Sequence, residues 1–528
     1  MGVPKVKTTI KQGLGRPKAG YDHYSMMLAY YKDAAAVGAY ANIGNKQYLS
    51  LDDAEADGVV DTCAEATAAT TTNTVTAIGA NGDTIDLSFT DYDGTVITIA
   101  SISKTAAETT TTLLATKLVA DVNARTYSTG YSATAGASGA YTVTAPKNRG
   151  IYPNTKSLTV TIVGTITHTN VAFAGGTKSR LAMWHYQIDR FFVRNPQGKL
   201  YFSIIFDDTA NNTTAFETQL KADIITKQNA YASLDDKAAG CRQFLINSPE
   251  RAFALTTMTA IQTSINTLFD AYLPAIAWYV SNTSGSALSA FTNTRALTAG
   301  GVSALITQSS TGGGLYQYYC QSTVFGHGGE ALGTESAASV SGSVGEVQLF
   351  NIADDGTENE KIMFMDSAFT DYKTLSGTTG GSNLIDQICD YGYVFARKIP
   401  NVTGTYWVEG NAAIDISDDY AHRETTRTVQ KLVRNFYAAI VTLLNAKNKL
   451  NKDDTLSDQA KANYLDRGTP PCRQMAVDED LSEDPSQNDG IIVSDLPIVA
   501  GKIPITIKAI PITIGREIDV TVQFVAKV

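Results

Sequence analysis

The chain has 528 residues, of which 43% are hydrophobic and 18% are charged, a balance typical of a globular protein with about three domains and ample core. The formal net charge of -10 disfavours nonspecific binding to nucleic acid, whose phosphates attract a clustered basic face. No apolar run reaches the roughly 18 residues that a bilayer-spanning helix needs. We therefore expect no direct contact with nucleic acid and no membrane insertion.

The first twenty residues run against this acidic balance. Glycine and proline are scattered among the five cations that precede the first acid, which are Lys5, Lys7, Lys11, Arg16 and Lys18. No apolar segment of a secretory signal follows them. Val6, Thr8 and Ile10 recur at the period of a β-strand but have no local partner. The pattern predicts an extended N-terminal arm over residues 1–20, which is either solvated or docked on a partner.

Residues 21–58 and 177–400 are predicted to form one mixed α/β body. Patterns typical of strands and of helices alternate along it, with strands at 200–206, 241–247 and 275–280 and helices at 215–230 and 258–272. This alternation indicates a doubly wound, largely parallel sheet. Later strands are expected at 361–365 and 391–397, with a helix over 383–391 between them. Ser50 before an Asp-Asp pair indicates a further helix start.

Residues 59–176 differ in composition, because they are rich in Thr, Ala and Gly and poor in large aromatic side chains. Turn signals such as Asn81-Gly82 separate short alternating runs at 84–89, 95–99, 141–144 and 158–163. One helix is expected over residues 106–123, where apolar residues recur at i+4. We predict a small β-rich peripheral domain inserted into the body. A disordered Thr-rich stalk is the alternative.

The longest helical pattern runs from about residue 418 to 450, within a C-terminal domain predicted over residues 401–528. Its apolar face consists of Val429, Leu432, Val433, Phe436, Ile440, Leu443 and Leu444. Arg427, Lys431 and Arg434 are spaced 4 and 3 residues apart and fall opposite that face. This basic stripe is either the solvated side of the helix or a contact for an acidic partner surface.

Two alternating runs near the end of the chain are typical of half-buried strands, the first with Ile503, Ile505 and Ile507 and the second with Ile518, Val520 and Val522. Pro504 and Pro511 cannot donate a backbone hydrogen bond, which favours strand starts, edges or bends. We therefore expect a C-terminal ribbon of strands whose unpaired backbone is completed by a strand from another chain.

Motifs that carry catalytic chemistry are missing from the sequence. There is no phosphate-binding GxxxxGK[ST], and the glycine clusters at 312–314 and 326–329 are interpreted as loops. The five cysteines lie far apart, without the spacing of a zinc site. His327 has no assignable nucleophile or carboxylate beside it. We expect no enzyme activity, no catalytic residue, no cofactor and no metal.

Several segments of the C-terminal third resemble the contractile tail sheath proteins of bacteriophages and of phage-tail-like contractile injection systems. They are YGYVFARK at 391–398, GTYW at 404–407, SDDYA at 417–421 and the helix with the basic stripe. The closing strands resemble the terminal strands of the same family. TVTAP at 142–146 and FAGG at 173–176 resemble a β domain found in many phage tail proteins.

The resemblance implies a sheath-type α/β body with an inserted β-rich domain and a C-terminal strand ribbon. It implies a structural subunit that polymerises helically around an inner tail tube protein and contracts to drive the tube through a cell envelope. The location implied is a virion tail assembled in the bacterial host cytoplasm. Further partners would be baseplate and tail terminator proteins. The residues of subunit-exchange strands would be Val6, Thr8, Ile10, Ile503, Ile505, Ile507, Ile518, Val520 and Val522, and those facing the tube would be Arg427, Lys431 and Arg434.

One departure from this family is expected after Leu450, where the chain reads as short and acidic and many sheaths carry a further helix. Two other functions compete with the sheath. The Thr-rich domain suggests a phage surface decoration or adhesin protein as the alternative, and the α/β body suggests a hydrolase as a third.

Overall fold

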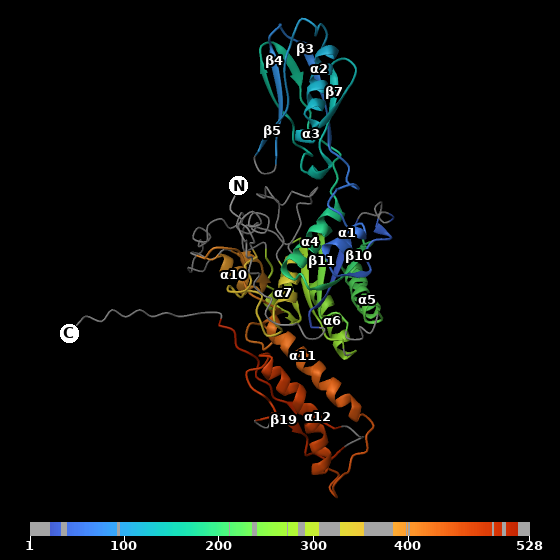
Figure 1. Cartoon of the computed structure of the whole chain (residues 1–528), viewed down its shortest axis with the longest axis vertical. Helices are drawn as coiled ribbons and strands as arrows, with labels where there is room; N and C mark the ends of the chain where they lie inside the picture. The colour runs from blue at the N-terminus through green and yellow to red at the C-terminus, as the bar shows by residue number, and fades with distance from the viewer. Residues whose placement is uncertain are drawn as a thin grey trace, which may run out of the picture.

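In the computed structural model the chain forms three parts along its long axis, which are a β-rich module, a central α/β body and a helical module (Figure 1). The mixed α/β class is confirmed. The structure describes residues 22–32, 38, 40–91, 95–210, 212–234, 240–271, 273–282, 291–305, 328–352, 384–397, 399, 402–487, 490–498 and 503–515. The predicted N-terminal arm, the strand at 361–365, the glycines at 312–314 and His327 lie outside these residues.

A seven-stranded sheet in the order β15-β14-β12-β11-β1-β10-β2 forms the centre of the body. Its strands are β1 (Tyr24–Tyr31), β2 (Lys46–Tyr48), β10 (Lys199–Phe206), β11 (Gln243–Ala252), β12 (Ile276–Asn282), β14 (Val302–Leu305) and β15 (Tyr393–Val394). Neighbouring strands are parallel except β2, which is antiparallel to β10. The predicted parallel sheet is therefore confirmed, with β11 extending beyond its expected end.

The central strand β1 supplies side chains to the cores on both faces of the sheet, and the sequence patterns did not predict it. Met26 and Leu28 enter one core, while Met27 and Ala29 enter the other. A strand buried on both faces is apolar at every position and lacks the alternation of a half-buried strand. Strands β10 and β12 also supply side chains to both cores and were predicted, so burial on both faces does not by itself distinguish β1 from them.

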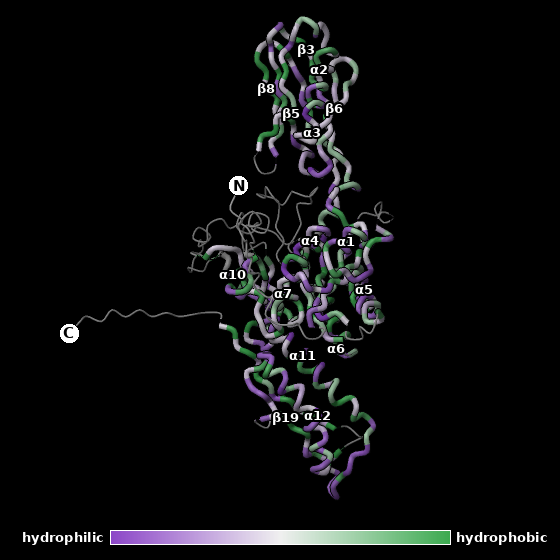
Figure 2. Tube along the Cα trace, viewed as in Figure 1, coloured by the Kyte–Doolittle hydropathy of each residue, from purple (hydrophilic) through white to green (hydrophobic). Residues whose placement is uncertain are grey.

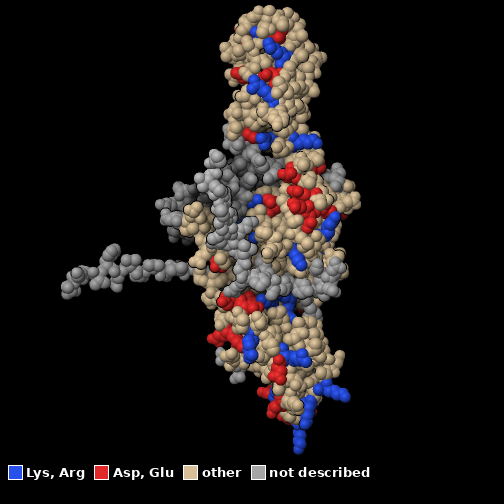
Figure 3. Space-filling model, viewed as in Figure 1, with Lys and Arg blue, Asp and Glu red and all other residues tan. Residues whose placement is uncertain are grey.

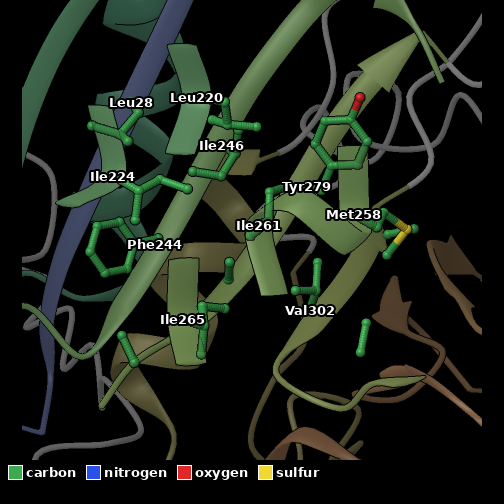
Figure 4. Packing of buried hydrophobic residues seen from close by; sticks show 14 of the residues in the cluster. Leu28, Leu220, Ile224, Phe244, Ile246, Met258, Ile261, Ile265, Tyr279 and Val302 are labelled. Atoms are coloured by element: carbon green, nitrogen blue, oxygen red, sulfur yellow. The ribbon is translucent and has the colours of Figure 1, made fainter. Parts of the chain in front are cut away.

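Helices cover both faces of the sheet. One face is covered by α5 (Thr213–Ala232) and α6 (Leu255–Asp270), both predicted, and Figure 4 shows their side chains packed on those of the strands. The other face is covered by α1 (Leu51–Ala56), α4 (Arg180–Arg194) and α7 (Gly328–Ala337). The predicted helix start at Ser50 is confirmed, because its side chain accepts a hydrogen bond from the amide of Asp53. The expected helix near residue 384 is α10 (Leu384–Asp390).

Glycines allow α7 to lie unusually close to α4. A Cβ atom on Gly329 would lie 1.9 Å from the carbonyl oxygen of Gln187, and one on Gly333 would lie 2.7 Å from that of Phe191. The glycine cluster at 326–329 was interpreted as a loop. This interpretation is wrong for residues 328 and 329, which begin α7. Glycine costs a helix about 1 kcal/mol relative to alanine, and here the close helix packing offsets that cost.

The β-rich module has two antiparallel sheets, in the orders β6-β7-β3-β9 and β5-β4-β8. The elements are β3 (Thr70–Ile78), β4 (Thr84–Thr90), β5 (Val96–Ser103), α2 (Thr111–Ala124), α3 (Thr126–Thr129), β6 (Ser132–Ala135), β7 (Ala140–Thr144), β8 (Thr159–Val163) and β9 (Ile166–Thr169). A separate core that includes Leu87, Phe89 and Leu118 lies between them. The four strands and the helix predicted here are confirmed, and the stalk alternative is wrong.

The two chain segments that enter and leave this module meet at Thr67 and Thr177. The amide of Thr67 donates to Oγ1 of Thr177 at 2.7 Å, and the amide of Thr177 donates to the carbonyl of Thr67 at 3.0 Å. Val59 is part of the body core, and Ala66 packs against Ala182 of α4. Judged by packing, residues 59–66 therefore belong to the body, and the module begins later than Val59.

The helical module contains α11 (Arg423–Ile440), α12 (Asp458–Val477) and the antiparallel pair β19 (Ile491–Val493) and β20 (Ile505–Ile507). Figure 2 shows hydrophobic and hydrophilic residues mixed along both helices, as expected of helices with one buried face. Two short strand pairs precede the module, β13 (Thr298–Ala299) with β18 (Ala413–Ile414) and β16 (Ala396–Arg397) with β17 (Tyr406–Trp407).

Two predictions for this module are wrong. The long helix ends at Ile440 rather than near residue 450, and the chain after Leu450 carries a 20-residue helix instead of a short acidic segment. That helix, α12, contains Pro470 and Pro471, which end most helices and so concealed it. Gly468 lets it approach α11, because a Cβ atom there would lie 2.4 Å from the ring of Phe436.

We predict that replacing residues 68–176 by a short Gly-Ser linker leaves the body folded, because Thr67 and Thr177 are already hydrogen-bonded to each other and the module has its own core. Thermal unfolding followed by circular dichroism measures this. As the matched control, a deletion that begins at Val59 removes part of the body core and is expected to unfold at a lower temperature. Equal loss of cooperative unfolding in both variants would show that the module is part of the body core.

We predict that acidification destabilises the β-rich module through His168. Its Nε2 atom is 2.6 Å from the hydroxyl of Tyr141, and burial lowers the pKa of His168 to about 4. Because the unfolded chain binds a proton at a pH near 6.5 and the folded chain does not, this stability is fully present above pH 6.5 and is lost as the pH falls towards 4. In thermal unfolding at pH 7, 5.5 and 4, His168→Gln should flatten the pH dependence, and an unchanged slope would contradict the assignment.

Candidate assembly surfaces

The carboxyl edge of the central sheet is the place where open α/β sheets bind ligands, at the point where the strand order reverses. Here that point lies between β1 and β11. The chain passes from β1 to β10 on one side of β1, and the next strand, β11, lies on the other side of β1. The described charged groups at this edge include Asp207 after β10 and Glu250 and Arg251 at the end of β11. Lys178 and Arg180 come from the start of α4.

These groups are paired with one another. Arg251 binds both carboxylate oxygens of Asp207, at 2.6 and 2.8 Å. Burial acts to raise the pKa of Asp207, but the hydrogen bonds from Arg251 and Thr209 outweigh it and hold the pKa below its usual value. Lys178 and Arg180 both pair with Glu250. The described edge is thus held by internal ion pairs.

The N-terminus of α4 is another place where an anionic ligand could bind. It is occupied by Glu65, whose Oε1 accepts hydrogen bonds from the amide of Leu181 at 2.9 Å and the hydroxyl of Ser179 at 2.6 Å. Among the described residues, His, Cys, Asp and Glu side chains form no cluster of three that could hold a metal ion.

The three cations of the predicted basic stripe point into the protein. Arg427 is 6% exposed and donates to the carbonyl of Ser339 at 3.0 Å. Lys431 contacts Asp480 at 2.5 Å, and Arg434 pairs with Asp22. The expectation of a solvated stripe is therefore wrong, since counter-ions from distant segments cover it. That these residues face a tube stays a prediction.

The most buried cation of this helix is Arg423, which is 2% exposed and was not among the predicted site residues. Its guanidinium lies 3.9 Å from the ring centre of Trp278, and its Nε donates to Glu335 at 2.8 Å. A further hydrogen bond of 2.8 Å reaches the carbonyl of Ala277 on β12. Arg423 precedes Arg427 by one helical turn, and this spacing is the signal that could have found it.

The apolar face of α11 is divided between a buried and an exposed part. Leu432 and Phe436 are 6% and 7% exposed and pack against α12. Val433 is 38% exposed, and Leu444, just beyond the helix, is 67% exposed. With its cations bound inside the subunit, the side of α11 that is open to solvent is partly apolar.

The predicted exchange strands are described for residues 503–507. Ile503, Ile505 and Ile507 are partly buried and pack against the cores of the helical module. Ile505 pairs with Val493 and Ile507 with Ile491. This strand therefore has a partner in its own chain, β19, which the sequence patterns did not predict. The other predicted exchange positions lie outside the described residues, and the exchange itself stays a prediction.

Comparisons with known proteins give limited matches. Residues 419–528, which include the whole helical module, match a family model described as DUF2586, C-terminal domain. Among curated proteins, none matches this chain. One similar solved structure is the cryo-EM structure of the anti-feeding prophage (AFP) baseplate, with 10% sequence identity, 64% of this chain and 80% of that chain covered, and a TM-score of 0.36.

Within the described residues, none of the helices combines the length and apolar character that a bilayer crossing requires.

We predict that Glu335→Gln destabilises the protein by about 3–5 kcal/mol, because it leaves Arg423 charged and buried without its carboxylate. The double variant Glu335→Leu with Arg423→Met should recover part of this loss, since the most buried cation is then removed with its partner and only Arg427, 3.7 Å from Glu335, loses its carboxylate. Arg473→Met is the matched control, because the side chain of Arg473 is 60% exposed in its pair with Asp484 and its loss should cost below about 1 kcal/mol. Urea unfolding measures all three, and equal effects of Glu335→Gln and the control would contradict the role of the buried pair.

Proposed function

We propose that the chain is a structural subunit of a phage-tail-like contractile particle, and specifically the sheath subunit that polymerises around the inner tube. The proposal is supported by the resemblance of segments 391–398, 404–407 and 417–421 to contractile sheath proteins. These segments are neighbours in the fold: Ala396 pairs with Trp407 and Arg397 with Tyr406, and residues 417–421 lead directly into α11.

The pairing of charges within the body supports a structural subunit over a hydrolase. At the switch point of the sheet, the described acids and bases neutralise one another as Asp207 with Arg251 and Glu250 with Arg180. The hydrogen bonds from Arg251 and Thr209 hold the pKa of Asp207 below its usual value, which makes this carboxylate a poor general acid or base. In the proposed particle no nucleotide is consumed, because the extended lattice is a metastable packing and contraction is a rigid-body rearrangement to a lower-energy one.

Two related functions remain as outcomes of the test. A baseplate subunit would assemble into rings or star-shaped plates, and a decoration or adhesin protein would form a discrete oligomer that binds glycans. Negative-stain microscopy of the purified full-length protein separates these outcomes, because the sheath proposal requires tubes, alone or around co-expressed tube protein. Rings without tubes would favour the baseplate role and contradict the sheath role.

We predict that removing residues 1–20, or ending the chain after Gly515, gives folded monomers that do not form tubes. In the proposed assembly these terminal segments join subunits by adding strands to neighbouring sheets. Ending the chain at Gly515 keeps β20 and its packing on α12, so the monomer should keep its unfolding temperature. The variant that lacks residues 68–176 is the control and should still form tubes. Normal tubes from either terminal truncation would show that contacts between the bodies suffice.

A further inference from the structure

The two ends of the described chain are connected to the same turn, which follows α12. At one end Asp22, just before β1, pairs with Arg434 and lies 4.0 Å from Lys431. Lys431 in turn binds Asp480 at 2.5 Å and lies 3.8 Å from Asp478. Figure 3 shows acidic and basic atoms side by side where the helical module joins the body. We call Asp22, Lys431, Arg434, Asp478 and Asp480 the junction cluster.

At the other end, the segment after β20 is bound to the next residues of that turn. The amide of Ser482 donates to the carbonyl of Ile510 at 2.9 Å, and its hydroxyl donates to the carbonyl of Pro511 at 2.8 Å. A bridge also joins Leu481 and Pro511. Asp22 and Pro511 are therefore both connected to residues 478–482 of the turn after α12, although almost the whole sequence lies between them.

The negative charge of Asp22 acts on cations of two different parts. It pairs with Arg434 of α11, and it also acts on Arg242, which lies just before β11 in the body and is 8% exposed. Burial and the neighbouring Arg434 lower the pKa of Arg242 to about 9, while Asp22 acts in the opposite direction. Without the charge of Asp22, the repulsion between Arg434 and Arg242 would no longer be offset.

We propose that the junction cluster is a releasable latch. In this latch Asp22 holds the start of β1 against the helical module, and loss of Asp22 loosens both the start of β1 and the segment that follows β20. The cluster suits release better than the pair of Glu335 and Arg423 does. Asp480 is 4% exposed, but Asp22, Lys431 and Arg434 are 13% to 14% exposed and Asp478 is 40% exposed. Arg423 and Glu335 are 2% and 1% exposed, so salt and water reach most of the latch more easily. The latch is a property of the single chain and does not depend on the proposed function.

Amide hydrogen exchange in the full-length protein tests this latch, because exchange reports local opening. In Asp22→Asn the amides of Asp480 and Ser482 should exchange about tenfold faster, an effect between those of exposed and fully buried ion pairs. Lys431→Met should accelerate the same amides and also that of Arg242, which donates to the carbonyl of Tyr24. Asp495→Asn is the control, because Asp495 pairs with Lys461 elsewhere in the same module, and it should leave all of these amides unchanged.

Unchanged exchange at Ser482 in Asp22→Asn would overturn the latch, because the start of β1 and the segment that follows β20 would then be independent. Acceleration in Lys431→Met that is confined to residues 478–482 would overturn it as well. If the variants do not fold, the wild-type protein in rising sodium chloride gives the same test. The amides of Asp480 and Ser482 should then exchange faster together with that of Arg242, and exchange that does not change with salt would contradict the proposal.

Discussion

The buried ion pair between Glu335 of α7 and Arg423 of α11 fixes the helical module on the body. Both side chains are almost fully buried, and the guanidinium also stacks on Trp278 of the central sheet. Separating them would leave an unpaired charge in the interior, which costs several kcal/mol. The body and the start of α11 therefore move as one unit. In an assembly of such chains, large displacements must occur between subunits or at the chain ends.

This pair depends in turn on how closely α7 can approach its neighbours. Gly329 and Gly333 bring α7 against α4 at distances that no other residue permits. The same helix carries Glu330, which pairs with Arg194 of α4, and Glu335 five residues later. Thus α7 connects α4 to α11 through two buried carboxylates, and the residues that make this possible have no side chains.

The periodic elements of the fold could be predicted from the sequence, because one face of each is buried and the pattern records it. The strands of the β-rich module and helices α5 and α6 are examples. The missed elements lack such a record. Helix α7 is rich in glycine, and α12 passes through Pro470 and Pro471. Spacing correctly placed the cations of α11 on one face, but it could not show that distant acids cover them.

The division of α11 among its neighbours changes what a partner can recognise on it. The cations are bound to Glu335, Asp480 and Asp22, and exchanging them for acids would place like charges together inside the subunit. Leu432 packs against α12. What the helix offers to a partner is its remaining, partly apolar side. Burial of apolar surface is insensitive to the salt screening that weakens charge pairs, so contacts made there would hold at ionic strengths that loosen the junction cluster. The salt dependence of contacts on the outer side of α11 and that of the junction cluster would therefore differ.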